Sequence, residues 1–267
     1  GSEMCIETAL IFFVFYLIGF FTLEQLITEP VYLIHCTLDD WIPFNEWFIF
    51  AYGSWFFLIP WALITLLRRD RSNYFYLCAV MFSGMAICLL LYLLFPNGLN
   101  LRPQTIPINN PAAWLVQAAW SMDTSTNVCP SIHVASTLAI LFAVWRSHIW
   151  HHRKLVVGGC TLLTVLICLS TLFLKQHSVV DVLCGIALTV LLHLAVTQLY
   201  EGFPALNQPP VPQHAHNEKD DAFCIVLFSV FLLVYAPALT PRRSYTDEIG
   251  LYSQMEMHIS VSYTHLR

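Results

Sequence analysis

Charged side chains are scarce in this chain. Its 12 Lys or Arg and 17 Asp or Glu residues make up only 11% of 267 positions, whereas an ordinary soluble domain carries about 25%. This scarcity excludes a soluble globular domain, a coiled coil and a disordered chain, because each of them needs many more charges in contact with water. The net charge of -5 leaves no basic surface, so we expect no nucleic-acid partner.

The sequence also lacks paired metal-ligating cysteines. None of its nine cysteines forms a Cys-x-x-Cys pair, so we expect no structural zinc site. Most of them lie in apolar stretches, where a thiol behaves as a small hydrophobic group. A disulfide between Cys36 and Cys129 is an alternative to two free thiols, and we favour the free thiols.

Long apolar runs are what the chain has instead. Six uncharged blocks approach the roughly 20 residues that a membrane-spanning helix needs. They cover residues 8–23, 47–67, 74–95, 129–145, 155–174 and 182–200. Their length and close succession predict an all-α, polytopic membrane protein in which residues 1–204 form a six-transmembrane-helix bundle.

The end of the chain differs in composition from the expected bundle. Residues 205–221 combine Pro, His and charged side chains, which predicts a polar linker. A seventh uncharged block, residues 222–240, is a candidate for a further hydrophobic helix. We assign no role to this block or to the tail, which together cover residues 222–267.

Basic residues gather in two of the expected loops. They are Arg68, Arg69 and Arg71 after the second block, and Arg146, Arg153 and Lys154 after the fourth. Both loops lie on one side if the blocks alternate, and the positive-inside rule makes that side cytoplasmic. The opposite, extracytoplasmic side then receives residues 96–128 and 175–181. Six tryptophans are expected in the interfacial aromatic belts: Trp41, Trp47, Trp55, Trp61, Trp114 and Trp120.

Three polar groups lie at helix ends on the expected outer side, within residues 95–103, 129–133 and 170–181. In a chain so poor in charge, ionisable groups at membrane helices indicate a functional site. His177 and Asp181 are four residues apart, so they can meet on one helix face. A carboxylate that accepts one imidazole N–H leaves the other ring nitrogen free as a nucleophile or base.

The remaining polar residues at these helix ends are suited to acid–base chemistry or to binding an anion. Ser131 and His133 stand at a helix start, where free backbone N–H groups and the helix dipole favour an anion. Arg102 and Lys175 add two cations on the same side. This combination suits phosphoryl transfer, which depends on placement and charge stabilisation. Taken singly, Ser131 has an alternative role as a helix cap, Arg102 as an interfacial anchor and His177 as an interfacial hydrogen-bonding residue.

Taken together, the three polar groups resemble the signature motifs of the type-2 phosphatidic acid phosphatase superfamily. The matching residues are Arg102-Pro103, then Pro130-Ser131-Ile132-His133, then Ser170 followed by His177 and Asp181. Order and spacing agree with the family over about residues 30–200. The resemblance implies a membrane-embedded lipid-phosphate phosphatase that works without a metal ion or other cofactor, with a lipid phosphate as substrate and membrane lipids as its surroundings.

The resemblance also implies a role for each matching residue. His177 would attack phosphorus and form a phosphohistidine, Asp181 would orient His177, and His133 would protonate the departing alkoxide. The phosphate oxygens would be bound by Arg102, Ser131 and Lys175.

Three positions depart from the family pattern. Phe95 stands where the family has Lys, Thr171 where it has Arg, and Ile132 where it usually has Gly. The bulky residue before His133 also resembles the lipid phosphotransferase branch, which includes inositol phosphorylceramide and sphingomyelin synthases. Hydrolysis and transfer to an alcohol therefore both stay open, and a non-catalytic membrane protein is a third alternative.

Overall fold

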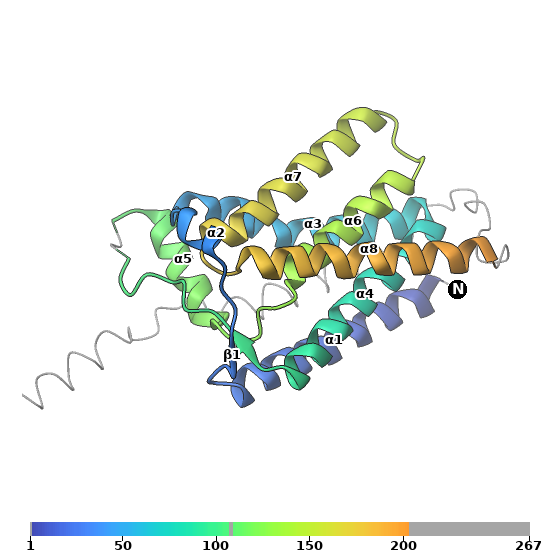
Figure 1. The fold of residues 1–267 in the computed structure, drawn as a ribbon. Helices are drawn as coiled ribbons and strands as arrows, with labels where there is room; N and C mark the ends of the chain where they lie inside the picture. The colour runs from blue at the N-terminus through green and yellow to red at the C-terminus, as the bar shows by residue number, and fades with distance from the viewer. Residues whose placement is uncertain (1, 107–108, 203–267) are drawn as a thin grey trace, which may run out of the picture.

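The computed structural model describes residues 2–106 and 109–202 (Figure 1). The predicted linker and the seventh apolar block lie outside the described residues. Most of the described chain is helical. Its elements are α1 (Ser2–Leu26), β1 (Tyr32–Leu33), α2 (Thr37–Trp41), η1 (Glu46–Phe48), α3 (Ile49–Arg69), α4 (Arg71–Leu94), β2 (Asn97–Gly98), α5 (Pro111–Met122), α6 (Ile132–Arg146), α7 (Arg153–Phe173) and α8 (Val179–Gly202).

Each of the six predicted apolar blocks overlaps a helix, and the described chain is mostly helical, which confirms the all-α expectation. The six-span arrangement is not established, because only four described helices are long and apolar enough to cross a membrane. They cover Glu46–Arg69, Arg71–Leu94, Arg153–Phe173 and Val179–Leu199. The helix α6 has 15 residues, which at 1.5 Å per residue spans about 22 Å of a hydrocarbon layer about 30 Å thick. In α1, the stretch Ile11–Leu26 is a shorter apolar segment of the same kind.

The helix boundaries follow from capping residues in the sequence. Asp70 ends α3 and caps α4, accepting a hydrogen bond from the Asn73 amide at 3.2 Å. Asn110 caps α5 in the same way, with Pro111 in the first turn. Ser131 caps α6. Each of these side chains satisfies a backbone N–H that the first helical turn leaves without a partner.

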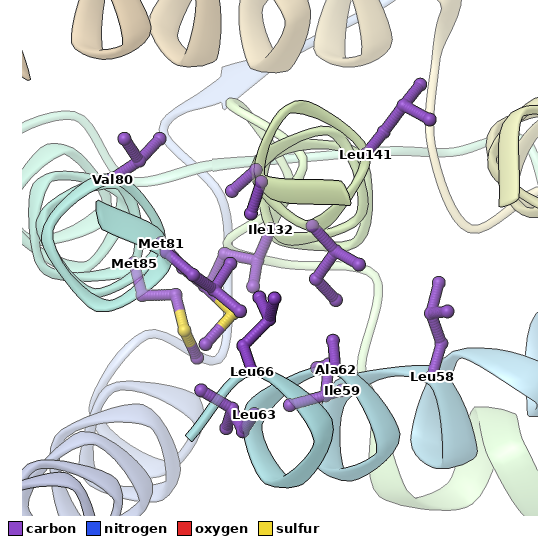
Figure 2. Packing of buried hydrophobic residues seen from close by; sticks show 14 of the residues in the cluster. Leu58, Ile59, Ala62, Leu63, Leu66, Val80, Met81, Met85, Ile132 and Leu141 are labelled. Carbon is purple, nitrogen blue, oxygen red and sulfur yellow. The ribbon is translucent and has the colours of Figure 1, made fainter. Parts of the chain in front are cut away.

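The helix α6 lies at the centre of the bundle and contacts α3, α4, α7 and α8. Figure 2 shows side chains of α3, α4 and α6 meeting in this interior, among them Leu66, Met81 and Ile132. The outer faces carry exposed apolar side chains such as Leu155 and Leu162 of α7. This pattern suits a lipid environment, in which close packing between helices, rather than water exclusion alone, holds the bundle together.

Small elements join the loops at one end of the bundle, where α7 ends and α8 begins (Figure 1). The strands β1 and β2 pair in parallel, with Tyr32 opposite Asn97, and Gly98 forms a further bridge to Thr126. A Cβ atom at Gly98 would lie 2.6 Å from the Ser125 carbonyl oxygen, so only glycine fits there. The loops before α2, before α5 and before α6 are thereby held together.

Candidate active site

The loop between α7 and α8 carries His177 and Asp181. The sequence Ser178-Val179-Val180-Asp181 forms a variant of the capping box at the start of α8: the Asp181 Oδ2 accepts from the Ser178 backbone amide at 2.8 Å, and the Val180 backbone amide, one residue earlier than usual, donates to the Ser178 hydroxyl at 3.1 Å. The Asp181 Oδ2 also lies 3.5 Å from the His177 Nδ1. The two side chains therefore approach each other as predicted, although His177 precedes the first helical residue. The turn and the capping box bring them together, not helix periodicity.

The second histidine comes from α6. His133 directs its Nδ1 toward the Nε2 of His177, at 3.4 Å. The Ser131 amide donates to the backbone oxygen of Asp181 at 3.1 Å and joins the starts of α6 and α8. If the Nδ1 of His177 carries its proton on the side of Asp181, its Nε2 presents a lone pair toward His133. A nucleophile and a proton donor would have this arrangement.

Aromatic rings of α3 surround His133. The rings of Tyr52 and Trp55 lie 4.7 Å and 4.5 Å from the imidazole, centroid to centroid. The expectation that Trp55 lies in an interfacial belt is wrong, because its side chain is buried and its Nε1 donates to the Ser136 hydroxyl at 2.8 Å. The indole fixes α3 against α6 next to the histidine. Sequence reasoning missed this role because nothing in the local pattern distinguishes a buried tryptophan from an interfacial one.

Arg102 reaches the same end of the bundle from the loop after β2. One guanidinium nitrogen donates to the backbone oxygens of Asp123 and Thr124, each at 2.9 Å, and to the Gln176 side-chain oxygen. The guanidinium also lies over the ring of Trp120, at 5.3 Å from the centroid. Trp120 thus contacts a site residue in addition to its predicted place near the interface.

Asp123 is an acidic residue that sequence reasoning did not single out. Its carboxylate accepts from the Tyr52 hydroxyl at 3.4 Å. Burial raises the pKa of Asp123, while Arg102 and His177 oppose this shift. No motif marks this residue, and only its position beside Arg102 shows that it belongs to the site.

Gln176, which directly precedes His177, is a second residue that sequence reasoning missed. Its side chain is 2% exposed. Because an arginine can only donate, the atom that faces Arg102 must be the amide oxygen, and this fixes the orientation of the amide. The amide nitrogen of Gln176 and the Nε of Arg102 are buried and have no hydrogen-bond partner among the described residues. Two unpartnered donors beside a histidine pair are suited to anion binding, since each costs about 1–3 kcal/mol when left unpaired.

Lys175 points elsewhere. Its amine donates to the backbone oxygens of Asp39 and Ile42, at 2.8 Å and 2.5 Å. Burial lowers the pKa of Lys175, and the nearby carboxylates of Asp39 and Asp40 oppose this shift. The structure therefore brings Arg102, Ser131, His133, His177 and Asp181 to one place and directs Lys175 toward α2; its role as a phosphate cation stays a prediction.

The positions that depart from the family pattern are also defined by the structure. The side chain of Phe95 is 55% exposed. Thr171 is buried, and its backbone oxygen accepts from the amides of Gln176 and His177, at 2.9 Å and 3.1 Å. Thr171 thus shapes the turn that carries His177 through its backbone. Cys36 and Cys129 are free thiols, as expected.

Side chains that commonly bind metal ions are not clustered in the described part of the chain. Within residues 2–106 and 109–202, no group of three or more His, Cys, Asp or Glu side chains is arranged to hold a metal ion. The groups that do converge are imidazoles, a carboxylate, a guanidinium and an amide, which suit an oxyanion.

Comparison with known proteins gives one match. Residues 73–204 match the family profile of the PAP2 superfamily, which confirms the resemblance deduced from the three motifs. The matched region contains all six predicted site residues. A search of curated proteins and a search of solved structures found no match. The family match supports an activity of the phosphatase or phosphotransferase type, and together with the four long apolar helices it indicates an integral membrane protein.

Proposed function

Because residues 73–204 match the PAP2 superfamily, we propose that the chain hydrolyses a lipid phosphomonoester or pyrophosphate through a phosphohistidine. The observation that carries the proposal is the row of three groups formed by Asp181, His177 and His133. The carboxylate lies 3.5 Å from one nitrogen of His177, and His133 lies 3.4 Å from the other.

The reaction proceeds in two displacements. The lone pair on the Nε2 of His177 attacks phosphorus, the P–N bond forms, and the P–O bond to the lipid breaks. His133 gives a proton to the departing alkoxide, and Asp181 stabilises the positive charge on the His177 ring. Water then attacks phosphorus, His133 takes a proton from it, and the P–N bond breaks to release phosphate and restore both histidines.

The phosphate oxygens require donors that are already in place before the reaction. We assign this role to Arg102, to Ser131 at the start of α6 and to the unpartnered amide nitrogen of Gln176. Lys175 is kept as a predicted phosphate cation, although its amine donates to two backbone oxygens in this structure.

The experiment is an assay of the purified protein in detergent. Phosphatidic acid, phosphatidylglycerophosphate, an isoprenyl pyrophosphate and a sphingolipid phosphate are supplied, and phosphate release is measured. We expect release from at least one of them, abolished in His177→Ala and retained in His151→Ala, which changes an exposed histidine far from the site. Full activity in His177→Ala would contradict the mechanism.

Transfer of the phosphoryl-bearing group to an alcohol is the second candidate, and the charge of the site favours it. Phe95 and Thr171 occupy two cationic positions of the family pattern, and the amine of Lys175 is engaged by backbone oxygens. Arg102 is then the cation in contact with the residues around His177. A phosphodiester carries one negative charge and a phosphomonoester up to two, so a site with fewer cations suits the diester better. Label that passes from a phosphodiester lipid to an added lipid alcohol, without phosphate release, would identify the transferase.

We also propose that the site faces the extracytoplasmic side, as the distribution of basic residues predicts. A membrane-impermeant thiol reagent on intact cells should label an engineered cysteine at residue 104 and spare one at Arg69. The reverse pattern would place the site on the cytoplasmic face.

A further inference from the structure

We propose that Asp39, on the short helix α2 and outside the family match, is a positioning residue that sets the place of His177. The inference rests on the proposed function insofar as His177 is the nucleophile. It concerns a contact between two segments that are far apart in the sequence, and it gives Asp39 a part in the reaction without contact to the substrate.

The carboxylate of Asp39 caps α8 from outside the helix. The side chain is 2% exposed. Its Oδ2 accepts from the Ser178 hydroxyl at 2.6 Å and from the Cys36 amide at 2.8 Å, and its Oδ1 accepts from the Val179 amide at 2.8 Å. Val179 is the first residue of α8, so the carboxylate lies at the positive end of that helix, where an anion is stabilised.

The same segment also holds the chain before His177. The amine of Lys175 donates to the backbone oxygens of Asp39 and Ile42, and Lys175 adopts a positive φ of 55°. A non-glycine residue in this conformation needs support from its surroundings. Contacts from α2 and from Ile42, which follows it, therefore hold the turn on both sides of His177. They reach Lys175 before the histidine, and Ser178 and Val179 after it.

Ser178 connects Asp39 to the histidine. Its hydroxyl donates to Asp39, whereas its amide donates at 2.8 Å to the Asp181 oxygen that lies 3.5 Å from the His177 Nδ1. A shift of Ser178 would thus change the position of the Asp181 carboxylate relative to His177. Misplacement of a reacting group by about 1 Å can cost about 100-fold in rate, so this chain of contacts matters for activity.

The donors around Asp39 keep its carboxylate ionised. Burial by itself would raise the pKa of Asp39, but the hydrogen bonds from Ser178, Val179 and Cys36 outweigh burial and hold the pKa below its ordinary value. The hydrogen bond from Ser178 therefore has a defined direction, with the hydroxyl as donor. Charged groups also lie near Asp39. The amine of Lys175 donates to the backbone oxygen of Asp39, and the Asp40 carboxylate lies 2.9 Å from the Nε2 of His35.

Asp39→Asn tests the proposal, with Asp40→Asn as the matched control. Asn keeps one acceptor, but its NH₂ group must face either the Cys36 N–H or the Val179 N–H. The control removes the same charge from the next residue, whose carboxylate is exposed and pairs with His35. We expect Asp39→Asn to lower kcat about 10- to 100-fold while KM changes less than about threefold, and to alter the pH profile of kcat. Asp40→Asn should behave as the wild type.

Hydrogen exchange supplies a readout that does not depend on activity. In Asp39→Asn the amides of residues 175–182 should exchange faster, whereas amides of α3 and α4 should keep their protection. Ser178→Ala should reproduce both the kinetic and the exchange effects, and the double variant should be no worse than the more affected single variant, because both changes break one chain of contacts.

The outcomes separate the two proposals. Wild-type kcat and pH profile in Asp39→Asn, equal losses in Asp39→Asn and Asp40→Asn, or a loss confined to KM would overturn the role of Asp39. Global loss of exchange protection would also overturn it, since Asp39 would then serve folding in general. A wild-type protein inactive on every substrate would refute the proposed function, while exchange at residues 175–182 would still decide whether Asp39 holds the turn.

Discussion

The two ends of α6 each lie near a buried carboxylate, and the two carboxylates differ in how far their hydrogen bonds are completed. At the C-terminal end, Asp70 accepts from the Ser147 hydroxyl at 2.6 Å and from the Asn73 side chain and amide at 2.8 Å and 3.2 Å. Both of its oxygens are engaged. At the N-terminal end, one oxygen of Asp181 and the Nδ1 of His177 are buried without a hydrogen-bond partner among the described residues.

This difference separates a fully paired cluster, which we interpret as structural, from the cluster that we propose to be functional. Both carboxylates cap a helix, Asp70 for α4 and Asp181 for α8. A fully paired cluster lowers the free energy of the fold and has no capacity left for a ligand. A cluster with unpartnered donors and acceptors costs stability, and native proteins keep such clusters mainly at sites of binding or catalysis.

The largest expected effect is the loss of activity in His177→Ala. Removal of a nucleophile should lower kcat by about 10⁴-fold or more. Because His177 lies in the cluster that costs stability, the melting temperature should stay the same or rise. Phosphate release and thermal unfolding in detergent measure the two quantities. A large fall in melting temperature would show that His177 stabilises the fold and that the contrast between the clusters is wrong.

Asp181→Asn should have the next largest effect. The amide cannot stabilise the charge that forms on His177 and can hold the wrong tautomer, so we expect kcat to fall about 10³- to 10⁴-fold. Single-turnover measurements should show slower phosphohistidine formation. An activity within threefold of wild type would remove Asp181 from its proposed role.

Gln176→Glu tests the unpartnered amide nitrogen. Glutamate keeps an acceptor for Arg102 but replaces the free donor by a negative charge, so we expect kcat/KM to fall about 10²-fold. Competitive inhibition by inorganic phosphate should weaken in parallel. Gln198→Glu, a matched change at an exposed position of α8, should leave both quantities unchanged, and an equal loss there would show a general charge effect.

Asp70→Ala, unlike the site variants, should lower stability and leave activity nearly unchanged. It leaves the Ser147 hydroxyl and the Asn73 amide without their acceptor, so we expect a destabilisation of about 1–3 kcal/mol with kcat changed less than about twofold. Thermal unfolding and the lipid-phosphate assay give the comparison. If kcat fell as far as in Gln176→Glu, the two ends of α6 would be coupled and not distinct.

The smallest expected effect is the loss, at acid pH, of the stabilisation that the Asp39 carboxylate provides. The folded-state pKa of Asp39 lies below its ordinary value of 3.8, so its contribution to stability is fully present above that pH and is lost as the pH falls toward the folded-state value. The melting temperature of Asp39→Asn should therefore differ from wild type most at neutral pH, and the two curves should converge in acid. A difference that does not change with pH would show that the charge of Asp39 is not involved.

The helices and the local part of the site could be predicted from the sequence. The absence of charge marks the apolar helices, and the turn that brings His177 toward Asp181 lies within a few residues. By contrast, the meeting of His133 with His177 is a contact between α6 and the turn before α8, 44 residues apart in the sequence. The motifs indicated that the two histidines act together, but only the packing of the two helices brings their nitrogens to face each other.

Lys175 and Trp55 show where prediction from sequence stops. A lysine near a nucleophile is expected to bind phosphate, and an interfacial tryptophan is expected to face lipid. Which partner a long side chain reaches depends on which distant segment passes within a few ångströms, and here α2 passes beside Lys175 and α6 beside Trp55.

The scarcity of charge therefore determined by itself that this is a helical membrane protein with few ionisable groups available for chemistry, because a charged side chain in lipid is costly and is kept only where it serves a purpose. The tertiary structure decided which of those groups meet, which of them have atoms without a partner among the described residues, and that Asp39 accepts hydrogen bonds from the turn after His177. These are contacts between segments distant in sequence, and they depend on the packing of whole helices, which no local pattern of residues specifies.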